Sequence, residues 1–149
     1  MLRIRIANLQ SVVPLDRRQL REVAKAVLAG EGVTTAAVSL ALVDDVTIHR
    51  LNKQFLHHDE PTDVLTFPLS TADTKSLEGE VVIGVEVARR QAAERGHVVR
   101  AELALYVIHG LLHLCGYDDT TRAAARRMRD RERHYLHLLR LPPIADAIA

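Results

Sequence analysis

The feature that most constrains this chain is a pair of histidines, His109 and His113, inside an apolar run near its C-terminal third. Residues four positions apart lie one turn apart on the same face of an α-helix, so both imidazoles would point to one side. Gly116 follows, where a helix would end and the backbone could turn back in a left-handed conformation. That turn would return a carboxylate, Asp118 or Asp119, to the two rings. Three protein ligands with a position left for water are the pattern of a catalytic metal site.

Gly110 separates this pattern from the zinc proteases, whose long motif has similar spacing. A His-x-x-x-His pair alone is weak evidence of a site, and the glycine and paired aspartates that follow strengthen it. In the proteases a Glu follows the first histidine and acts as general base. Gly110 occupies that place here. The pattern therefore predicts a metal site whose base does not lie in the protease position.

Length and composition indicate a folded protein. The 149 residues are 48% hydrophobic and 26% charged, which suits one domain with a proper core. The net charge is +1, so any basic surface must be local, and the single cysteine excludes an intrachain disulfide and fits a reducing compartment. We find neither a signal peptide nor an apolar run long enough for a membrane span. We therefore expect one domain over residues 1–149, in the cytoplasm.

Hydrophobic periodicity predicts alternating strands and helices. Short apolar runs predict strands at 2–7, 36–43, 64–68 and 81–85, the second buried on both faces. Helical spacing and caps predict a helix from Asp16 to Gly30, a second starting at Asp44 or Asp45, and others over 86–95, 100–114 and 120–139, the last capped by Asp119 or Thr120. Polar loops are expected at 56–63 and 70–79. The class is mixed α/β.

The predicted last helix has two faces of interest. Glu132 falls on its apolar face, so its carboxylate must find a partner, either near the metal turn or in a structural ion pair. Another face carries four arginines: Arg122, Arg126, Arg129 and Arg133. This row either follows a phosphate backbone or is a solvated helix face, and the sequence favours neither.

Several blocks in order resemble the YbeY family of bacterial metal-dependent endoribonucleases. The family motif H-G-x-L-H-L-x-G-Y-D-H is matched from His109 to Asp118. The other matching blocks are Leu51-Asn52, Asp59 to Phe67, Gly79 to Ile83 with Glu86 and Gln91, and Met128 with Glu132. The resemblance implies a small mixed β-sheet of about four strands packed with about five helices. The metal site would lie in a cleft formed by the His-x-x-x-His helix and the following turn.

The resemblance also implies an activity. It predicts a metal-dependent endoribonuclease that acts on single-stranded RNA in ribosomal RNA maturation and ribosome quality control. The implied partners are ribosomal RNA and the small ribosomal subunit, with ribosomal proteins or a GTPase as further candidates and no membrane. The oligomeric state is not indicated.

The third-ligand position departs from the family, which carries a histidine where this chain has Asp119. We therefore expect His109, His113 and Asp119 to hold one divalent ion, and prefer Asp119 to Asp118. Zinc is expected by resemblance, and two imidazoles with one carboxylate also suit nickel, iron or manganese. The carboxylate makes the centre less positive than a third imidazole would, so a bound water should be less acidic. Cys115 is expected to pack as a small apolar residue.

A second departure concerns catalysis. The family usually carries an Arg, thought to serve catalysis, after an aromatic residue, but here Leu56 follows Phe55. A leucine cannot bind phosphate or stabilise developing charge. His57, His58, Arg50 or Lys53 could take the place of that arginine. Of these, His57 and His58 are the candidate catalytic residues, for contact with a substrate phosphate or as general acid, and ordinary exposed loop residues are the alternative.

Two other functions remain open. Leu56 motivates a non-catalytic RNA-binding or ribosome-binding biogenesis factor that keeps the metal site. A third function is a metal-dependent hydrolase of another substrate, including peptide, although Gly110 argues against an ordinary zinc protease.

Overall fold

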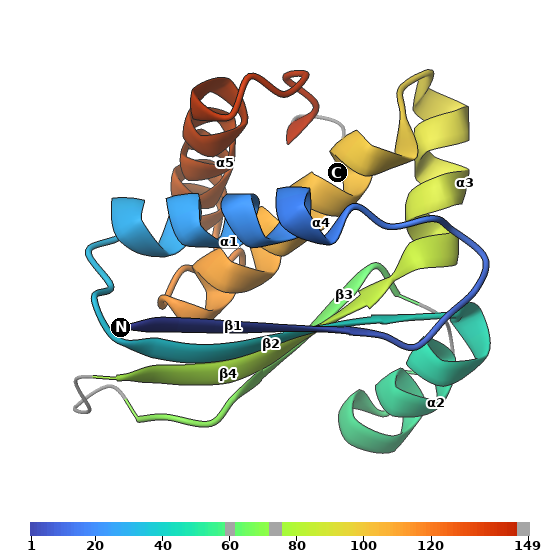
Figure 1. The fold of residues 1–149 in the computed structure, drawn as a ribbon, viewed down its shortest axis with the longest axis horizontal. Helices are drawn as coiled ribbons and strands as arrows, with labels where there is room; N and C mark the ends of the chain where they lie inside the picture. Colours follow the sequence, from blue (N-terminus) through green and yellow to red (C-terminus); the bar gives the residue numbers. More distant parts are fainter. Residues whose placement is uncertain (59–61, 72–75, 146–149) are drawn as a thin grey trace.

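The protein is built on a mixed β-sheet (Figure 1). The computed structural model describes residues 1–58, 62–71 and 76–145. Within these residues the sheet has four strands: β1 (Leu2–Asn8), β2 (Ala36–Val43), β3 (Val64–Pro68) and β4 (Leu77–Gly84). Their order is β1-β2-β4-β3, with β1, β2 and β4 parallel and β3 antiparallel to β4. The expected small mixed sheet is confirmed.

Helices cover the two faces of the sheet unequally. The described residues form five: α1 (Arg17–Gly30), α2 (Asp45–Leu56), α3 (Val85–Arg95), α4 (Val99–Leu114) and α5 (Arg122–Leu138). Helices α1, α3, α4 and α5 lie on one face, and α2 lies on the other (Figure 1). Asp16 caps α1 as predicted, and Asp44 rather than Asp45 caps α2, because their carboxylates accept the backbone N–H groups of Gln19 (3.1 Å) and Thr47 (2.9 Å).

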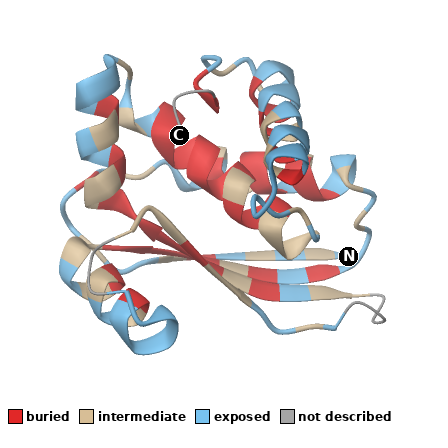
Figure 2. Ribbon diagram, turned by 180° about the vertical axis from the view of Figure 1, so that it is seen from behind, coloured by how far each residue is buried: buried red, intermediate tan, exposed pale blue. Residues whose placement is uncertain are grey.

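Helix α4 is the buried centre of the larger helical layer (Figure 2). Eleven of its 16 residues are buried, so it is apolar nearly all round, as a helix enclosed by other elements must be. It packs on β3 and β4 and is flanked by α1, α3 and α5. No helix in the described ranges is long and apolar enough to cross a bilayer. This enclosure fixes the position of any side chain that α4 directs outward.

The sheet face opposite α4 is only partly covered. Helix α2 buries Ile48 there against the ends of three strands, in a cluster with Ala41, Val43, Leu65 and Val82. Beyond α2, Ala37 is exposed and Ser39 is half-buried. The prediction that β2 is buried on both faces is therefore wrong for its first half. Small side chains there give an apolar run although only one face of the strand is covered.

Two predicted boundaries are also wrong. β4 begins at Leu77 rather than Val81, because residues 77–80 pair with β2 while Glu80 lines the uncovered side of the sheet, which hides the apolar pattern. α5 begins at Arg122, and its cap is Thr121, whose hydroxyl accepts the backbone N–H of Ala124 at 3.0 Å. The residues predicted as caps instead form the turn before the helix.

Candidate metal centre

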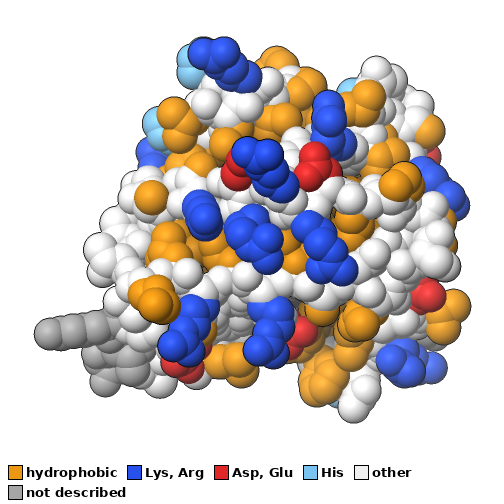
Figure 3. Space-filling model, viewed as in Figure 1, with side chains coloured by type: hydrophobic (Ala, Val, Ile, Leu, Met, Phe, Trp, Pro, Cys, Tyr) orange, Lys and Arg blue, Asp and Glu red, His pale blue; other side chains and the backbone are white. Residues whose placement is uncertain are grey.

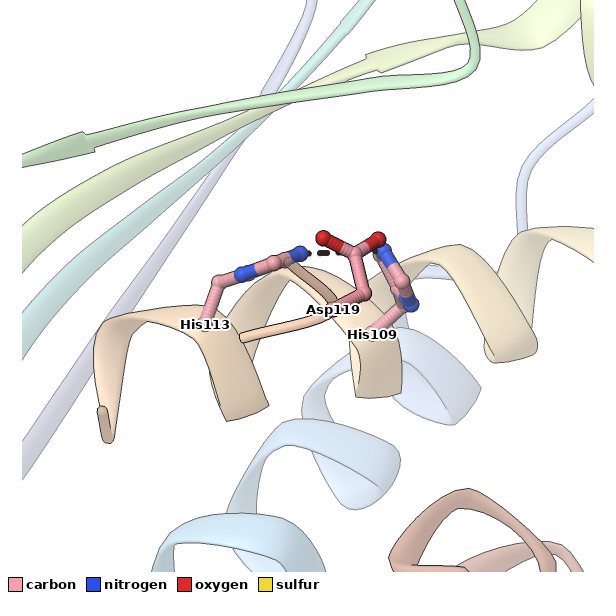
Figure 4. Close-up of side chains that lie close together, drawn as sticks. All are labelled: His109, His113 and Asp119. Atoms are coloured by element: carbon pink, nitrogen blue, oxygen red, sulfur yellow. Dashed lines mark hydrogen bonds between the residues drawn. The ribbon is translucent and has the colours of Figure 1, made fainter. Parts of the chain in front are cut away.

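The spacing of His109 and His113 on α4 places both imidazoles on one side of the helix, as predicted (Figure 4). Their Nε2 atoms are 3.1 Å apart, and the ring centroids are 4.7 Å apart with an interplanar angle of 81°. Both residues are half-buried, whereas the helix around them is buried. The two rings therefore converge on one point at the surface of a rigid core.

The turn after α4 brings a carboxylate back to this point. Gly116 has a φ of +105°, which a side chain would disfavour. The N–H groups of Gly116 and Tyr117 donate to the carbonyls of His113 and Leu112, each at 3.0 Å, which closes the helix in a Schellman motif. The chain then reverses, and Asp119 lies beside the two rings (Figure 4).

The three predicted ligand residues lie together. His109, His113 and Asp119 each offer a ligand atom, and these atoms are all within 4.8 Å of one another. Asp118, the competing carboxylate, turns to Thr120 instead and accepts its hydroxyl (2.9 Å) and its backbone N–H (3.1 Å). These hydrogen bonds lower the pKa of Asp118. Asp119 is thus the carboxylate that the turn directs to the histidines.

Each imidazole has a hydrogen-bond partner at Nδ1, whereas its Nε2 faces the other imidazole. A carbonyl only accepts, so Nδ1 of His113 carries a hydrogen and donates it to the carbonyl of Tyr117 at 3.1 Å. Its Nε2 is then left with a free lone pair. Glu132 Oε1 lies 3.3 Å from Nδ1 of His109, and its carboxylate favours the same tautomer there. Such partners on the far nitrogen are the usual support of metal-ligating histidines. The partner of the buried Glu132 is therefore next to the site.

The two imidazoles differ electrostatically. Burial alone would lower the pKa of His109, but the hydrogen bond and the charge of Glu132 outweigh burial and raise it. Burial and the neighbouring His109 lower the pKa of His113. Of the two imidazoles, His113 therefore loses its proton more readily, and His109 holds its proton more tightly.

This donor set fits a divalent ion. Two ligand atoms about 2.0–2.1 Å from a tetrahedral ion lie roughly 3.3 Å apart, close to the observed 3.1 Å between the Nε2 atoms. Two imidazoles and one carboxylate leave a coordination position open. Cys115 adjoins the turn but is not part of the group, and burial raises its pKa to about 11, so it remains a protonated thiol. The group could hold a metal ion through His109, His113 and Asp119 alone.

Gly110 lies where α4 crosses the sheet. A Cβ there would be 2.5 Å from Cγ1 of Val81 and 3.2 Å from Cγ1 of Val64. The side chain of a protease-type glutamate has no room at this position. The sequence-based prediction that the base lies elsewhere thus has a steric reason.

The predicted catalytic histidines lie outside this group. His57 ends α2 with a φ of +59°, and the N–H of His58 donates to the carbonyl of Asn52 at 3.3 Å. Both side chains are exposed, at the end of a helix on the opposite face of the sheet from α4 (Figure 1). Residues 59–61 of the same sequence block lie outside the described residues. Leu56 is 50% exposed.

Fold and site together define a class of protein: a small α/β domain whose buried central helix and following turn present a His/His/Asp group that could hold a metal ion. A family model described as "Endoribonuclease YbeY" matches residues 5–140. The chain belongs to the YbeY family.

Individual relatives agree with this assignment. An endoribonuclease YbeY from Pelotomaculum thermopropionicum is 40% identical over 146 residues, and one from Carboxydothermus hydrogenoformans is 41% identical over 139. Both alignments cover 91% of this chain and 96% of the relative. The solution structure of TM1509 from Thermotoga maritima is similar with a TM-score of 0.68 and 32% identity, over 91% of this chain and 88% of that one.

Proposed function

We propose that the protein is a metal-dependent endoribonuclease that cleaves single-stranded RNA in ribosomal RNA maturation and ribosome quality control. Membership of a family whose relatives are named endoribonucleases supports an RNA-cleaving hydrolase. The observation that carries the metal dependence is the convergence of His109, His113 and Asp119 within 4.8 Å, with both Nδ1 atoms already engaged elsewhere. Ribosomal RNA in the cytoplasm is the proposed substrate, and ribosomal proteins or a GTPase are proposed partners.

The three side chains would hold one divalent ion, with zinc first and nickel, iron or manganese as alternatives. When bound, such an ion polarises a phosphoryl oxygen and lowers the pKa of a water molecule. Asp119 contributes a negative charge where a third imidazole would be neutral, so this polarisation is weaker than at a three-histidine site.

The protein's own groups keep the ligands in place. Glu132 and the carbonyl of Tyr117 direct the Nε2 lone pairs of His109 and His113 to one point, because each engages the opposite nitrogen. The buried core of α4 holds both rings relative to the sheet. A preorganised centre of this kind needs little rearrangement when substrate binds.

Basic side chains provide a surface for the RNA backbone. Helix α5 starts shortly after Asp119, and its arginine row is largely exposed, with Arg122, Arg126 and Arg133 exposed and Arg129 half-buried. Lys and Arg side chains also gather over α1 and β1 (Figure 3). Arginines close to the metal turn would hold phosphates near the group, so RNA affinity should fall with rising salt.

His57 and His58 remain our candidates for contact with a substrate phosphate or for the general acid. Both are exposed and start the connection that leads to β3. At its other end Asp63 is braced, because its carbonyl accepts the N–H of Gly84 at 2.8 Å and its carboxylate accepts the N–H of Val64 at 2.8 Å. Separate His57→Ala and His58→Ala variants should lower kcat if either transfers a proton, and should raise KM alone if either only binds phosphate.

The experiment that tests the proposed function joins elemental analysis to cleavage of a single-stranded RNA. We expect the purified protein to carry about one transition-metal ion and to cleave RNA, and the His109→Ala/His113→Ala variant to lose both. Asp118→Ala is the matched control for Asp119→Ala, because only Asp119 lies in the group. Asp119→His should preserve or tighten zinc binding. Full metal retention in the double variant would remove the proposed site.

Leu56 favours a second candidate, a non-catalytic RNA-binding or ribosome-binding biogenesis factor. Its exposed aliphatic side chain cannot neutralise charge on a phosphate. RNA binding without metal-dependent cleavage supports this candidate, whereas cleavage abolished by a chelator and restored by metal rejects it. Peptide substrates offered in parallel test a hydrolase of another substrate, which the packing of Gly110 disfavours.

A further inference from the structure

Glu31 gathers hydrogen-bond donors from two distant segments. It follows α1 directly, and its Oε1 accepts the hydroxyl of Tyr117 at 2.7 Å. Its Oε2 accepts Nη2 and Nε of Arg131, at 2.6 and 3.1 Å, and the hydroxyl of Tyr135. Its side chain is only 9% exposed. These four residues, Glu31, Tyr117, Arg131 and Tyr135, are called the Glu31 cluster below.

Gly30 and Arg131 both pack against the Tyr135 ring of this cluster. A Cβ on Gly30 would lie 2.6 Å from Cε1 of Tyr135, so a side chain there would displace the tyrosine ring. The guanidinium of Arg131 lies over the same ring, 5.1 Å from its centroid, and donates to the Tyr135 hydroxyl at 2.9 Å. The cluster therefore joins the end of α1 to α5 through one well-packed carboxylate.

The carboxylate at its centre is ionised at neutral pH. Burial alone would raise the pKa of Glu31, but the hydrogen bonds from Tyr135, Arg131 and Tyr117 outweigh burial and lower it. Hydrogen bonds to an ionised acceptor are about twice as strong as those between neutral groups. The Tyr117 hydroxyl is therefore held firmly.

Tyr117 connects this cluster to the candidate metal centre. Its side chain reaches Glu31, while its backbone carbonyl accepts the Nδ1 hydrogen of His113 at 3.1 Å. Asp119 follows two residues later along the same turn. An anchored Tyr117 ring thus restrains both its own carbonyl, which sets the His113 tautomer, and the segment that carries Asp119.

We propose that Glu31 is a positioning residue for the metal centre. By holding the hydroxyl of Tyr117, it keeps Nε2 of His113 aimed at the metal and limits how far Asp119 can move away. This inference rests on the proposed function, because it assumes that the His/His/Asp group binds a metal ion.

Two matched variants separate positioning from general stability. Tyr117→Phe and Tyr135→Phe each remove one hydroxyl from the same carboxylate, but only Tyr117 belongs to the metal turn. Zinc affinity of the metal-free proteins is measured by competition with a chromophoric chelator, and the visible spectrum of the cobalt(II) forms reports ligand geometry. Tyr117→Phe should weaken zinc binding by roughly tenfold, as for other partners of metal ligands, and alter the cobalt spectrum. Tyr135→Phe should keep the wild-type affinity and spectrum.

A Glu31 variant completes the experiment. Glu31→Ala should weaken zinc binding as Tyr117→Phe does, and Glu31→Gln should rescue part of it, because an amide can still bond the Tyr117 hydroxyl. Unfolding free energies of all variants are measured in parallel. Wild-type affinity in Tyr117→Phe overturns the inference, as does an equal loss in both Phe variants. Failure of the wild type to bind zinc, cobalt, nickel, iron or manganese overturns the proposed function itself, so the two failures are distinguishable.

Discussion

Gly110→Ala tests whether the close approach of α4 to the sheet is required where the histidines lie. The new methyl group would be 2.5 Å from Cγ1 of Val81, against about 3.5–4.0 Å for relaxed carbon contacts. Val81 is fully buried and β-branched on a strand, so it cannot rotate away at low cost. Overpacking of this kind costs about 1–3 kcal/mol, and the better helix propensity of alanine offsets about 1 kcal/mol. A 2.5 Å contact belongs in the upper part of that range, about 2–3 kcal/mol, so we expect a net loss of about 1–2 kcal/mol.

Urea denaturation followed by circular dichroism measures this loss. Val81→Ala is the matched second variant, because it removes the methyl groups that the new side chain meets. In the Gly110→Ala/Val81→Ala protein the added methyl fills part of the vacated space. The loss of unfolding free energy in this double variant should therefore be about 1 kcal/mol smaller than the sum of the losses in the two single variants. A Gly110→Ala protein as stable as the wild type, or strict additivity of the two changes, would refute the close-contact argument.

Three further variants address other parts of the protein. Glu132→Gln should weaken zinc affinity by roughly 10–100-fold in a chelator competition. In the metal-free protein Glu132→Gln should also cost more stability at about pH 6 than at about pH 9, because folding raises the pKa of His109. The stability contributed by His109 and Glu132 is then complete below the unfolded pKa of His109, about 6.5, and is lost as pH rises through its folded pKa. Equal losses in urea denaturation at both pH values would contradict this. Leu56→Arg should raise kcat/KM for RNA cleavage by roughly tenfold or more, with Leu56→Gln as the uncharged control, because a charged hydrogen bond to phosphate contributes about 1.5–3 kcal/mol; equal rates would show that no phosphate lies within reach. His97→Ala should lower the unfolding free energy by about 1.5–3 kcal/mol, because it removes the 2.5 Å contact to the fully buried Glu102, and an unchanged thermal midpoint would argue against that contact.

Local patterns in the sequence predicted much of the site. The spacing of His109 and His113 sets their common side of a helix whatever surrounds it, and Gly116 marks where the chain reverses. The choice between Asp118 and Asp119 rested on resemblance alone. The structure adds a physical reason for it, because Thr120 engages Asp118.

Other features depend on contacts that no local pattern encodes. The partners of Glu31 lie 86, 100 and 104 residues away in sequence, so neither helical spacing nor capping rules indicate the cluster. The acceptor for His113 is a backbone carbonyl, which every residue type possesses. The uncovered half of β2 was missed because small residues such as Ala37 and Ser39 suit a buried and an exposed strand face alike, and only the placement of α2 decides between them.

The central claim is that the His/His/Asp group holds a metal ion needed for RNA cleavage. Its most direct test is a titration of zinc into the metal-free protein, with cleavage of a single-stranded RNA followed at each addition. We predict no cleavage without metal and a plateau at about one equivalent, for both the wild type and Asp118→Ala, and no activity at any zinc level for His109→Ala/His113→Ala. Cleavage by the metal-free wild type, or by the double variant, would contradict this account.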